Sequence, residues 1–323
     1  MTGLTEREII RIFTNQFADQ HGVPLGFDDD VSAIPLSSKT WIIVKTDMLV
    51  GSTDVPPGMT TQEAARKAVV ATVSDFAAKG IQPQALMVSL GMPGPTEAKK
   101  IRDVARGLDQ AAQEYNCKII GGDTNQAEDL VINVAGIGIA NPKKLVRRDG
   151  ARPGDIVAVT GPFGKSAAGL KILMSNPKKQ IVRYRRPLVR AVLRPRARLE
   201  TGIALAKAGG VTSSTDSSDG LALSLHQIAE ASNVGINLDT IPIAPVVRQF
   251  ARELRLSAID LALYGGEEYE LVLTVSPRRF PALKKRVPSL MKIGTIEPAN
   301  HGLTAKLGGE RLQIEDRGWE HFT

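Results

Sequence analysis

The chain has 323 residues, enough for two domains of ordinary size with buried cores. Lysine and arginine number 41 against 34 aspartates and glutamates, and the net charge of +7 allows anionic ligands or nucleic acid as partners. The single cysteine, Cys117, excludes an intrachain disulfide and is typical of the reducing cytoplasm. No run of 18 apolar residues occurs, so we expect neither a membrane span nor a signal peptide.

Hydrophobic periodicity predicts a mixed series of helices and strands. Thr60 and Glu63 form a capping box for a helix that runs to Lys79 and is closed by Gly80. A strand at 41–44 is expected to deliver Lys45, Thr46 and Asp47 at its end. Other expected helices lie at 4–19, 97–115 and 221–232, and other strands at 84–90, 130–139 and 271–275.

Three consecutive aspartates, Asp28 to Asp30, belong in a loop because they are poor helix and strand formers. Carboxylates about 4 Å apart repel by roughly 4 kcal/mol at an effective dielectric of 20. Mg²⁺ or Ca²⁺ between them would offset this repulsion, and a solvated acidic turn is the alternative. Asp75 lies in an almost wholly apolar helix, where a carboxylate is costly unless it is paired or bound to metal. Its alternative is an exposed stripe beside Lys79.

Two glycine-containing segments resemble phosphate-binding turns. CKIIGGDTN predicts a short strand and a tight turn before Asp123 and Thr124, which suits a phosphate–metal pair or an ordinary turn. Gly164-Lys165-Ser166 resembles the end of a P-loop, but Val159 stands where the first glycine is required, so that interpretation fails. Ser166 can still meet a phosphate at a helix N-terminus or simply be its N-cap.

Further motifs lie in the second half. The turn at 215–220 is acidic, and a helix-capping role for Asp219 explains one of its two aspartates but not both. Trp319, in an aromatic-poor tail, could stack on a flat ligand ring or only dock the tail. Residues 177–198 carry nine lysines and arginines and no acid, but no nucleic-acid readout motif, which favours a solvated or anion-facing surface over a nucleic-acid patch.

Seven motifs occur in an order and spacing that resembles the thiamine-monophosphate kinases. They are FDDD…KTDML, VSDFAAKG, GGDTN, RRDGARPGD, TGPFGKSAAGL, STDSSDGL and GGEEYEL, and they span nearly the whole chain. This family belongs to the superfamily of aminoimidazole ribonucleotide synthetase and selenophosphate synthetase. The resemblance implies a two-domain α/β (α+β) fold: an N-terminal mixed domain at 1–145, which dimerises through its strands, and a C-terminal domain at 146–323, which completes the nucleotide and substrate site.

The resemblance also implies an activity, namely direct transfer of the γ-phosphoryl group of ATP onto thiamine monophosphate, assisted by several Mg²⁺ ions. No covalent or general-base residue is expected, because the acceptor phosphate is already ionised. The implied partners are thiamine monophosphate, ATP and a second copy of the chain, without nucleic acid or membrane. The implied Mg²⁺ ligands are Asp30, Thr46, Asp47, Asp75, Asp123, Asp216 and Asp219; the ATP contacts are Gly122, Asp123, Arg148 and Ser218; the substrate contacts are Asp54, Glu267 and Trp319.

Some positions depart from the family pattern. Lys45 replaces a serine that helps to hold one Mg²⁺ ion, and we hypothesise that its ammonium takes the place of one metal cation beside Asp47. Asp54 replaces a substrate-facing histidine that is usual in bacterial members, and Glu268 replaces an aspartate. Asp54 could pair with the positive thiazolium ring of thiamine, or it could indicate a different heterocyclic acceptor.

Overall fold

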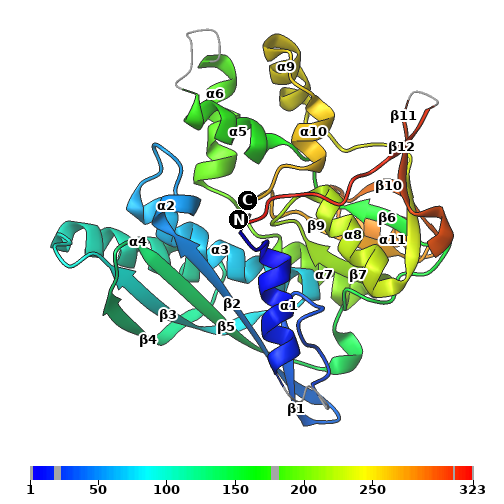
Figure 1. Ribbon diagram of the computed structural model, residues 1–323. Helices are drawn as coiled ribbons and strands as arrows, with labels where there is room; N and C mark the ends of the chain where they lie inside the picture. The colour runs from blue at the N-terminus through cyan, green and yellow to red at the C-terminus, as the bar shows by residue number, and fades with distance from the viewer. Residues whose placement is uncertain (1–2, 18–22, 176–181, 308–309, 322–323) are drawn as a thin grey trace.

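The computed structural model describes residues 3–17, 23–175, 182–307 and 310–321. Two α/β units lie side by side, each built on its own mixed sheet, and the two ends of the described chain meet between them (Figure 1). The expected fold class is therefore confirmed. The last strand of the first sheet ends at Ala140 and the first strand of the second begins at Ile156. The expected boundary between 145 and 146 falls in this connection and stays a prediction.

The first sheet has five strands in the order β1-β2-β5-β3-β4. Only β3 and β4 are parallel, and the other neighbours are antiparallel. Helices α3 and α4 cover one face of this sheet, which we call the inner face, and the opposite, outer face carries exposed apolar side chains. The elements of this unit are α1 (Glu6–Gln16), β1 (Ser32–Ser37), β2 (Thr40–Val50), α2 (Gly51–Asp54), α3 (Thr61–Lys79), β3 (Pro83–Met92), α4 (Ala98–Glu114), β4 (Lys118–Gln126) and β5 (Val131–Ala140).

Strand β2 is longer than the sequence pattern predicts. It pairs with β5 along ten consecutive positions, so 45–47 lies inside the strand and not at its end. Because side chains alternate between the faces of a strand, Lys45 and Asp47 share the inner face with buried Ile43 and Leu49. Thr46 points to the outer face, where its hydroxyl donates a hydrogen bond of 2.9 Å to Oδ1 of Asn133.

The two glycines of GGDT form no turn, and that prediction is wrong. Strand β4 runs straight through them as the edge of the sheet, with a register irregularity opposite Leu86 and Met87. A Cβ at Gly122 would lie 1.8 Å from the carbonyl oxygen of Val88. The glycine is therefore required for close approach between strands, and not for a change of chain direction.

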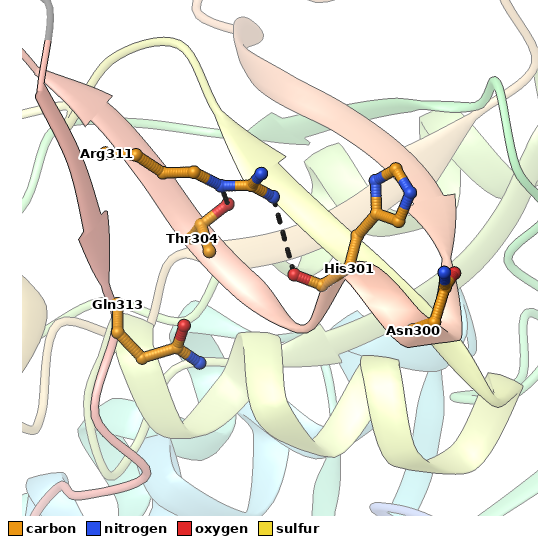
Figure 2. Close-up of a pocket in the computed structure, with 5 residues that line it drawn as sticks. All are labelled: Asn300, His301, Thr304, Arg311 and Gln313. Atoms are coloured by element: carbon orange, nitrogen blue, oxygen red, sulfur yellow. Dashed lines mark hydrogen bonds between the residues drawn. The ribbon is translucent and has the colours of Figure 1, made fainter.

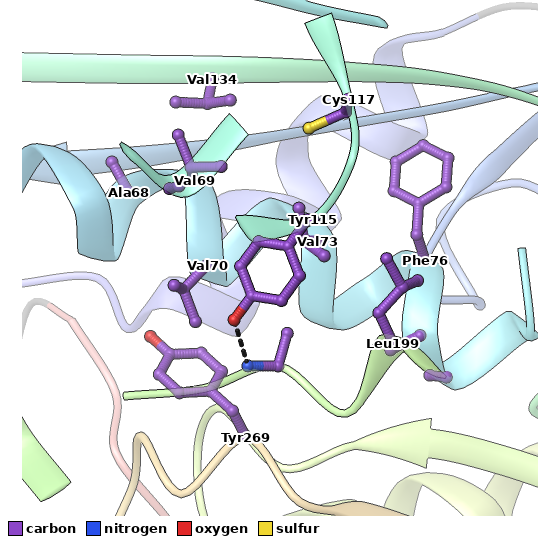
Figure 3. Packing of buried hydrophobic residues seen from close by; sticks show 14 of the residues in the cluster. Ala68, Val69, Val70, Val73, Phe76, Tyr115, Cys117, Val134, Leu199 and Tyr269 are labelled. Atoms are coloured by element: carbon purple, nitrogen blue, oxygen red, sulfur yellow. Dashed lines mark hydrogen bonds between the residues drawn. The ribbon is translucent and has the colours of Figure 1, made fainter. Parts of the chain in front are cut away.

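Helix α3 begins and ends as predicted. Thr60 and Glu63 form a reciprocal capping box, and Gly80 closes the helix with a φ of 69°. The helix is buried along most of its length because it packs on β2 and β5 of the first unit and on α7 and β7 of the second. Figure 3 shows the core around it, including Val69, Val73 and Phe76 together with residues from other elements.

The second sheet has seven strands in the order β12-β11-β8-β10-β6-β9-β7. Helices α5, α6, α9 and α10 gather on one side of this unit, and α8 lies against the sheet (Figure 1). Its elements are β6 (Ile156–Val159), α5 (Lys165–Met174), α6 (Val182–Leu193), α7 (Leu199–Ala208), β7 (Val211–Asp216), α8 (Leu221–Ser232), β8 (Val234–Leu238), α9 (Pro245–Leu254), α10 (Ala258–Leu263), β9 (Leu271–Val275), α11 (Phe280–Arg286), β10 (Met291–Pro298), β11 (Leu303–Leu307) and β12 (Glu310–Gln313), with short 3₁₀ turns at Pro142–Lys144 and Ala299–His301.

Two predicted helix caps are wrong. Gly220, and not Asp219, is the N-cap of α8, and Gly164 precedes α5 where Ser166 was a candidate cap. Both glycines have positive φ values, 115° and 94°, which a serine or aspartate adopts only with strain. Asp219 and Ser166 are thereby released from capping. Of the basic stretch at 177–198, residues 177–181 lie outside the described residues, and α6 occupies much of the remainder.

Candidate functional site

The acidic loop before β1 is held by two cations, the buried Lys79 and the partly buried Arg148. Lys79, at the end of α3, has no exposed surface, and its ammonium lies 2.5 Å from Asp29 and 2.6 Å from Asp30. Arg148 forms an ion pair with Asp30 and donates its backbone N–H to Asp29 at 3.0 Å. The alternative of a solvated acidic turn is therefore wrong for Asp29 and Asp30, which are fixed between the two units.

Three carboxylates converge at this point from three parts of the chain. Oxygens of Asp30, Asp75 and Asp216 lie within 4.8 Å of one another, and all three residues are buried. Asp30 accepts a hydrogen bond of 2.7 Å from the Thr215 hydroxyl, and Asp216 accepts one of 2.6 Å from the Ser74 hydroxyl. Asp75 is thus not on an exposed stripe beside Lys79, and both side chains face the interior.

The pKa values of these carboxyl groups diverge because their neighbours differ. For Asp30, burial would raise the pKa, but Lys79 and Arg148 hold it well below its ordinary range. Burial raises the pKa of Asp216 to about 7, and the charge of Asp30 adds to the shift. Burial likewise raises the pKa of Asp75 well above its ordinary value, against the opposing effect of Lys45. The cluster therefore lacks the positive charge needed to keep every member ionised.

Asp47 extends the cluster along β2. The Lys45 ammonium lies 3.4 Å from Oδ1 of Asp47 and 3.1 Å from Oδ2 of Asp75. The second carboxylate oxygen of Asp47 is buried without a hydrogen-bond partner among the described residues. Closely spaced carboxylate oxygens, one of them unsatisfied, are the donor set that Mg²⁺ prefers. The residues present therefore fit a divalent cation.

A hollow of about 120 Å³ opens beside this cluster. Three of its lining residues, Asp54, Glu267 and Trp319, are the predicted substrate contacts, and Asp47, Ser218 and Asp219 join them there. One oxygen of Asp54 accepts a hydrogen bond of 2.7 Å from the backbone N–H of Val50. Burial, followed by the charge of Glu6, raises the pKa of Asp219 to about 6. Predicted substrate and metal residues thus share one cavity.

The GGEEYEL segment reaches this hollow in a strained conformation. Glu267 and Tyr269 adopt left-handed backbone angles, with φ of 63° and 52°, which non-glycine residues rarely do. Their N–H groups donate to the carbonyl oxygens of Ser218 and Ser217, at 2.5 and 3.0 Å, which ties the segment to the acidic turn after β7. Glu267 also forms an ion pair with Lys67 of α3.

The C-terminal tail that carries Trp319 is fastened at both sides of that residue. The Trp319 N–H donates to the carbonyl oxygen of Asp219 at 2.9 Å. Arg7 of α1 forms ion pairs with Asp316 at 2.8 Å and with Glu320 at 3.2 Å. The N-terminal helix therefore holds the tail that lines the hollow, and Figure 1 shows α1 close to the end of the described chain.

Three predicted site residues are not brought to the cluster. Thr46 faces the outer side of the first sheet, as described above. Asp123 lies opposite Ser89 of β3, Ser89 lies opposite Asn133 of β5, and Asn133 lies opposite Met48 of β2. These four residues form one row across the outer face. Gly122 lies in the same edge strand, so three strand spacings, about 14 Å, separate both residues from β2.

Sequence reasoning missed the buried Lys67 of α3 and misjudged Lys79 of the same helix, which it placed beside an exposed stripe. Lys67 donates to the carbonyl oxygen of Asp54 at 2.9 Å and pairs with Glu267, so it joins two substrate-contact candidates. Lys79 neutralises the acidic loop. The signal was present, because a lysine in a helix whose surface is apolar nearly all round needs a buried anion.

Other hollows contain few of the predicted residues. One of about 390 Å³ lies at the edge of the second sheet, where Arg311 donates to the Thr304 hydroxyl (Figure 2). A second, of about 550 Å³, is bordered by the loop at 23–29 and by Arg148. A third, of about 280 Å³, is lined by arginines of the basic segment and by Glu267 and Glu270. Arg198 is paired with Glu270, so part of that segment is neutralised internally.

Comparison with known proteins places the chain in a family. The model of the AIR synthase related protein, N-terminal domain, matches residues 28–140, and that of the C-terminal domain matches residues 152–305. A thiamine-monophosphate kinase of Nitrosopumilus maritimus is 36% identical and covers 100% of both chains, and one of Pyrococcus abyssi is 36% identical and covers 100% of this chain and 97% of its own. The chain belongs to the thiamine-monophosphate kinase family. The resemblance drawn from the seven motifs is confirmed.

Solved structures agree with the fold. A structure of AaThiL complexed with AMPPCP and TMP superposes with a TM-score of 0.86 at 28% identity, covering 98% of this chain and 97% of that one. Thiamine monophosphate kinase from Aquifex aeolicus gives a TM-score of 0.80 at 27% identity, covering 94% and 97%. HypE of E. coli, a hydrogenase maturation protein, shares the fold alone, with a TM-score of 0.71 at 22% identity.

Proposed function

We propose that this member of the thiamine-monophosphate kinase family transfers the γ-phosphoryl group of ATP to thiamine monophosphate, giving thiamine diphosphate and ADP. The observation that carries the proposal is the shared hollow, in which Asp54, Glu267 and Trp319 lie beside Asp47 and the buried carboxylates. Family members act on thiamine monophosphate by name, and one relative is described with AMPPCP and TMP bound.

The carboxylates suit the charge problem of this reaction. Transfer between two phosphates brings several negative charges together and depends on positioning and neutralisation more than on covalent help. We propose that Asp30, Asp47, Asp75, Asp216 and Asp219 hold Mg²⁺. When bound, Mg²⁺ would supply positive charge that offsets the charge of the phosphates.

The protein's own groups have positioning roles in this proposal. Arg148 pairs with Asp30 of the cluster, and Ser218 lines the hollow. In this proposal both residues contact the nucleotide. Glu267 and Asp54 present carboxylates toward the positively charged thiazolium, and Trp319 offers a ring on which a flat heterocycle can stack. Because the acceptor phosphate is ionised, the residues need only orient it, and no general base is assigned.

We further propose a homodimer formed through the outer face of the first sheet. The exposed fractions of Met48, Met87 and Ile139 on this face are 62%, 44% and 51%. Large apolar side chains grouped on one exposed face indicate a protein–protein contact. Asp123 and Gly122 belong to the exposed edge strand of this sheet, remote from the cluster of their own chain. A partner pairing on this face would bring Asp123 toward a site, and Met48→Glu with Met87→Glu should yield monomers in analytical ultracentrifugation.

The decisive experiment incubates the purified protein with ATP, Mg²⁺ and thiamine monophosphate and separates the products by chromatography. Equimolar thiamine diphosphate and ADP would establish donor and acceptor together. Mg²⁺-dependent ATP binding without product would contradict the acceptor, and other heterocycles that can meet Asp54 would then be tested. Among the described residues, the structure contains no helix whose length and apolar character would let it span a membrane.

A further inference from the structure

Lys45 places its ammonium group between two carboxylates of the site, where a positive charge offsets their repulsion. Its side chain lies with Asp47 on the inner face of β2, and the two charged residues are flanked there by buried Ile43 and Leu49. Its ammonium bridges Asp47 and Asp75, at 3.4 and 3.1 Å. This is the geometry of an ion held between two carboxylates.

The other cations of the site are engaged elsewhere. Lys79 binds Asp29 and Asp30, and Arg148 binds Asp30 and the backbone of the acidic loop. Among the described residues, the ion pairs recorded for Asp47 and Asp75 are both with Lys45. Within the described part of the chain, Lys45 is therefore the cation that is paired with the Asp47–Asp75 edge of the cluster.

We propose that Lys45 is a covalently attached cation that replaces one divalent ion at the Asp47–Asp75 edge of the site. The inference rests on the proposed metal-dependent function and deepens it. An ammonium cannot dissociate from the protein, so this part of the charge is present at every Mg²⁺ concentration. It also occupies the space between the two carboxylates and excludes a second cation from it.

The test counts bound ions without any acceptor. Mn²⁺ binding is measured by electron paramagnetic resonance and by calorimetry, on the full chain with and without a non-hydrolysable ATP analogue. Lys45→Ser, which opens the space and adds an oxygen ligand, should bind one more Mn²⁺ per chain than the wild type. Lys45→Arg keeps the charge and should match the wild type. Lys292→Met, which removes an exposed lysine paired only at 3.9 Å with Asp239, is the matched control.

The outcomes separate this inference from the proposed function. If the wild type binds Mn²⁺ and Lys45→Ser binds the same number of ions, the inference is wrong while metal-dependent transfer stands. A wild type that binds no Mn²⁺ even with nucleotide would overturn both. Failure of thiamine diphosphate formation with normal ion counts would overturn only the acceptor.

A measurement on the wild type covers the case in which Lys45→Ser does not fold. Limiting acetic anhydride labels lysines according to their accessibility, and mass spectrometry reports each one, with Lys292 as the internal reference. If Lys45 fills the cation position permanently, its labelling should be unchanged when Mg²⁺ is added. Increased labelling of Lys45 on Mg²⁺ addition would show that a metal ion displaces it, which contradicts the proposal.

Discussion

At the scale of single residues, the site shows how neighbours decide what a carboxylate does. Asp30 and Asp216 are both buried and lie in the same cluster, yet their pKa values move in opposite directions. Asp30 has Lys79 and Arg148 as partners, whereas Asp216 has a serine hydroxyl and the charge of Asp30. One carboxylate is neutralised by the protein, and the other is one that the proposed Mg²⁺ would neutralise.

Replacing Asp216 by Asn separates two effects of its carboxylate: the lower stability of the folded protein and the proposed binding of metal. Without metal at pH 8, Asp216→Asn should raise the melting temperature, because a buried and repelled negative charge is removed. Its stabilisation by Mg²⁺ should shrink and its kinase activity should fall by about two orders of magnitude, since a proposed metal ligand is lost. Asp239→Asn, on the exposed surface, is the control. A lower metal-free melting temperature in Asp216→Asn would contradict this account.

Glu268 gives a pH dependence outside the metal cluster. Burial raises its pKa to about 7, above the ordinary 4.5, while its Oε1 accepts the Ser166 N–H at 2.9 Å. The folded protein then holds the proton more tightly than the unfolded chain, so stability falls as pH rises from about 4.5 to 7 and levels off above. Glu268→Gln should remove this component, which thermal melts of both proteins between pH 5 and 8 would reveal. Parallel melting curves across that range would contradict the prediction.

At the scale of elements, the N-terminal helix controls the C-terminal tail. The backbone N–H of His321 donates to Glu6. Arg7 forms ion pairs with Asp316 and Glu320, which lie on either side of Trp319 in the chain. Helix α1 therefore fixes the Trp319 ring at the hollow. A segment without buried residues of its own thus has a positioning role.

Arg7→Ala should therefore weaken acceptor binding more than nucleotide binding. We expect the KM for thiamine monophosphate to rise by up to about tenfold, the equivalent of one aromatic contact of about 1.4 kcal/mol. The KM for ATP should change little. Arg11→Ala, in the same helix, serves as the control in steady-state kinetics with each substrate varied. Equal changes in both KM values would indicate a general loss of stability in place of a positioning role.

Elements differed in how far the sequence could predict them. Helix α3 was predictable at both ends, because capping chemistry is local. Strand β4 was not, because GGDT is equally compatible with a turn, and the reason for Gly122 is a neighbouring strand distant in sequence. The lysines at 67 and 79 were misjudged or missed for the same reason, since their anionic partners lie on other elements. Asp75 was identified because a lone acid in an apolar helix is unusual in any fold.

At the scale of the whole molecule, the position of Asp123 makes the proposed dimer testable through activity. If Asp123 serves the site of its partner, chains with Asp123→Ala and chains with Asp75→Asn should be inactive alone. Mixed after unfolding and refolding together, they should recover about a quarter of wild-type activity, because half of the dimers are mixed and each has one intact site. Absence of recovered activity would assign Asp123 to the site of its own chain, and an active Asp123→Ala protein would assign it to no site.

The burial of α3 between the two units has a consequence for motion. Its two sides contribute to one continuous apolar core that contains residues of both units, and Gly202 of α7 approaches so closely that a Cβ there would lie 1.9 Å from the Ala77 carbonyl oxygen. Units that share a central helix in this way cannot swing apart about a hinge without exposing their core. The turnover of this protein should therefore proceed with rigid domains, and substrates should enter and leave through the rearrangement of short peripheral segments.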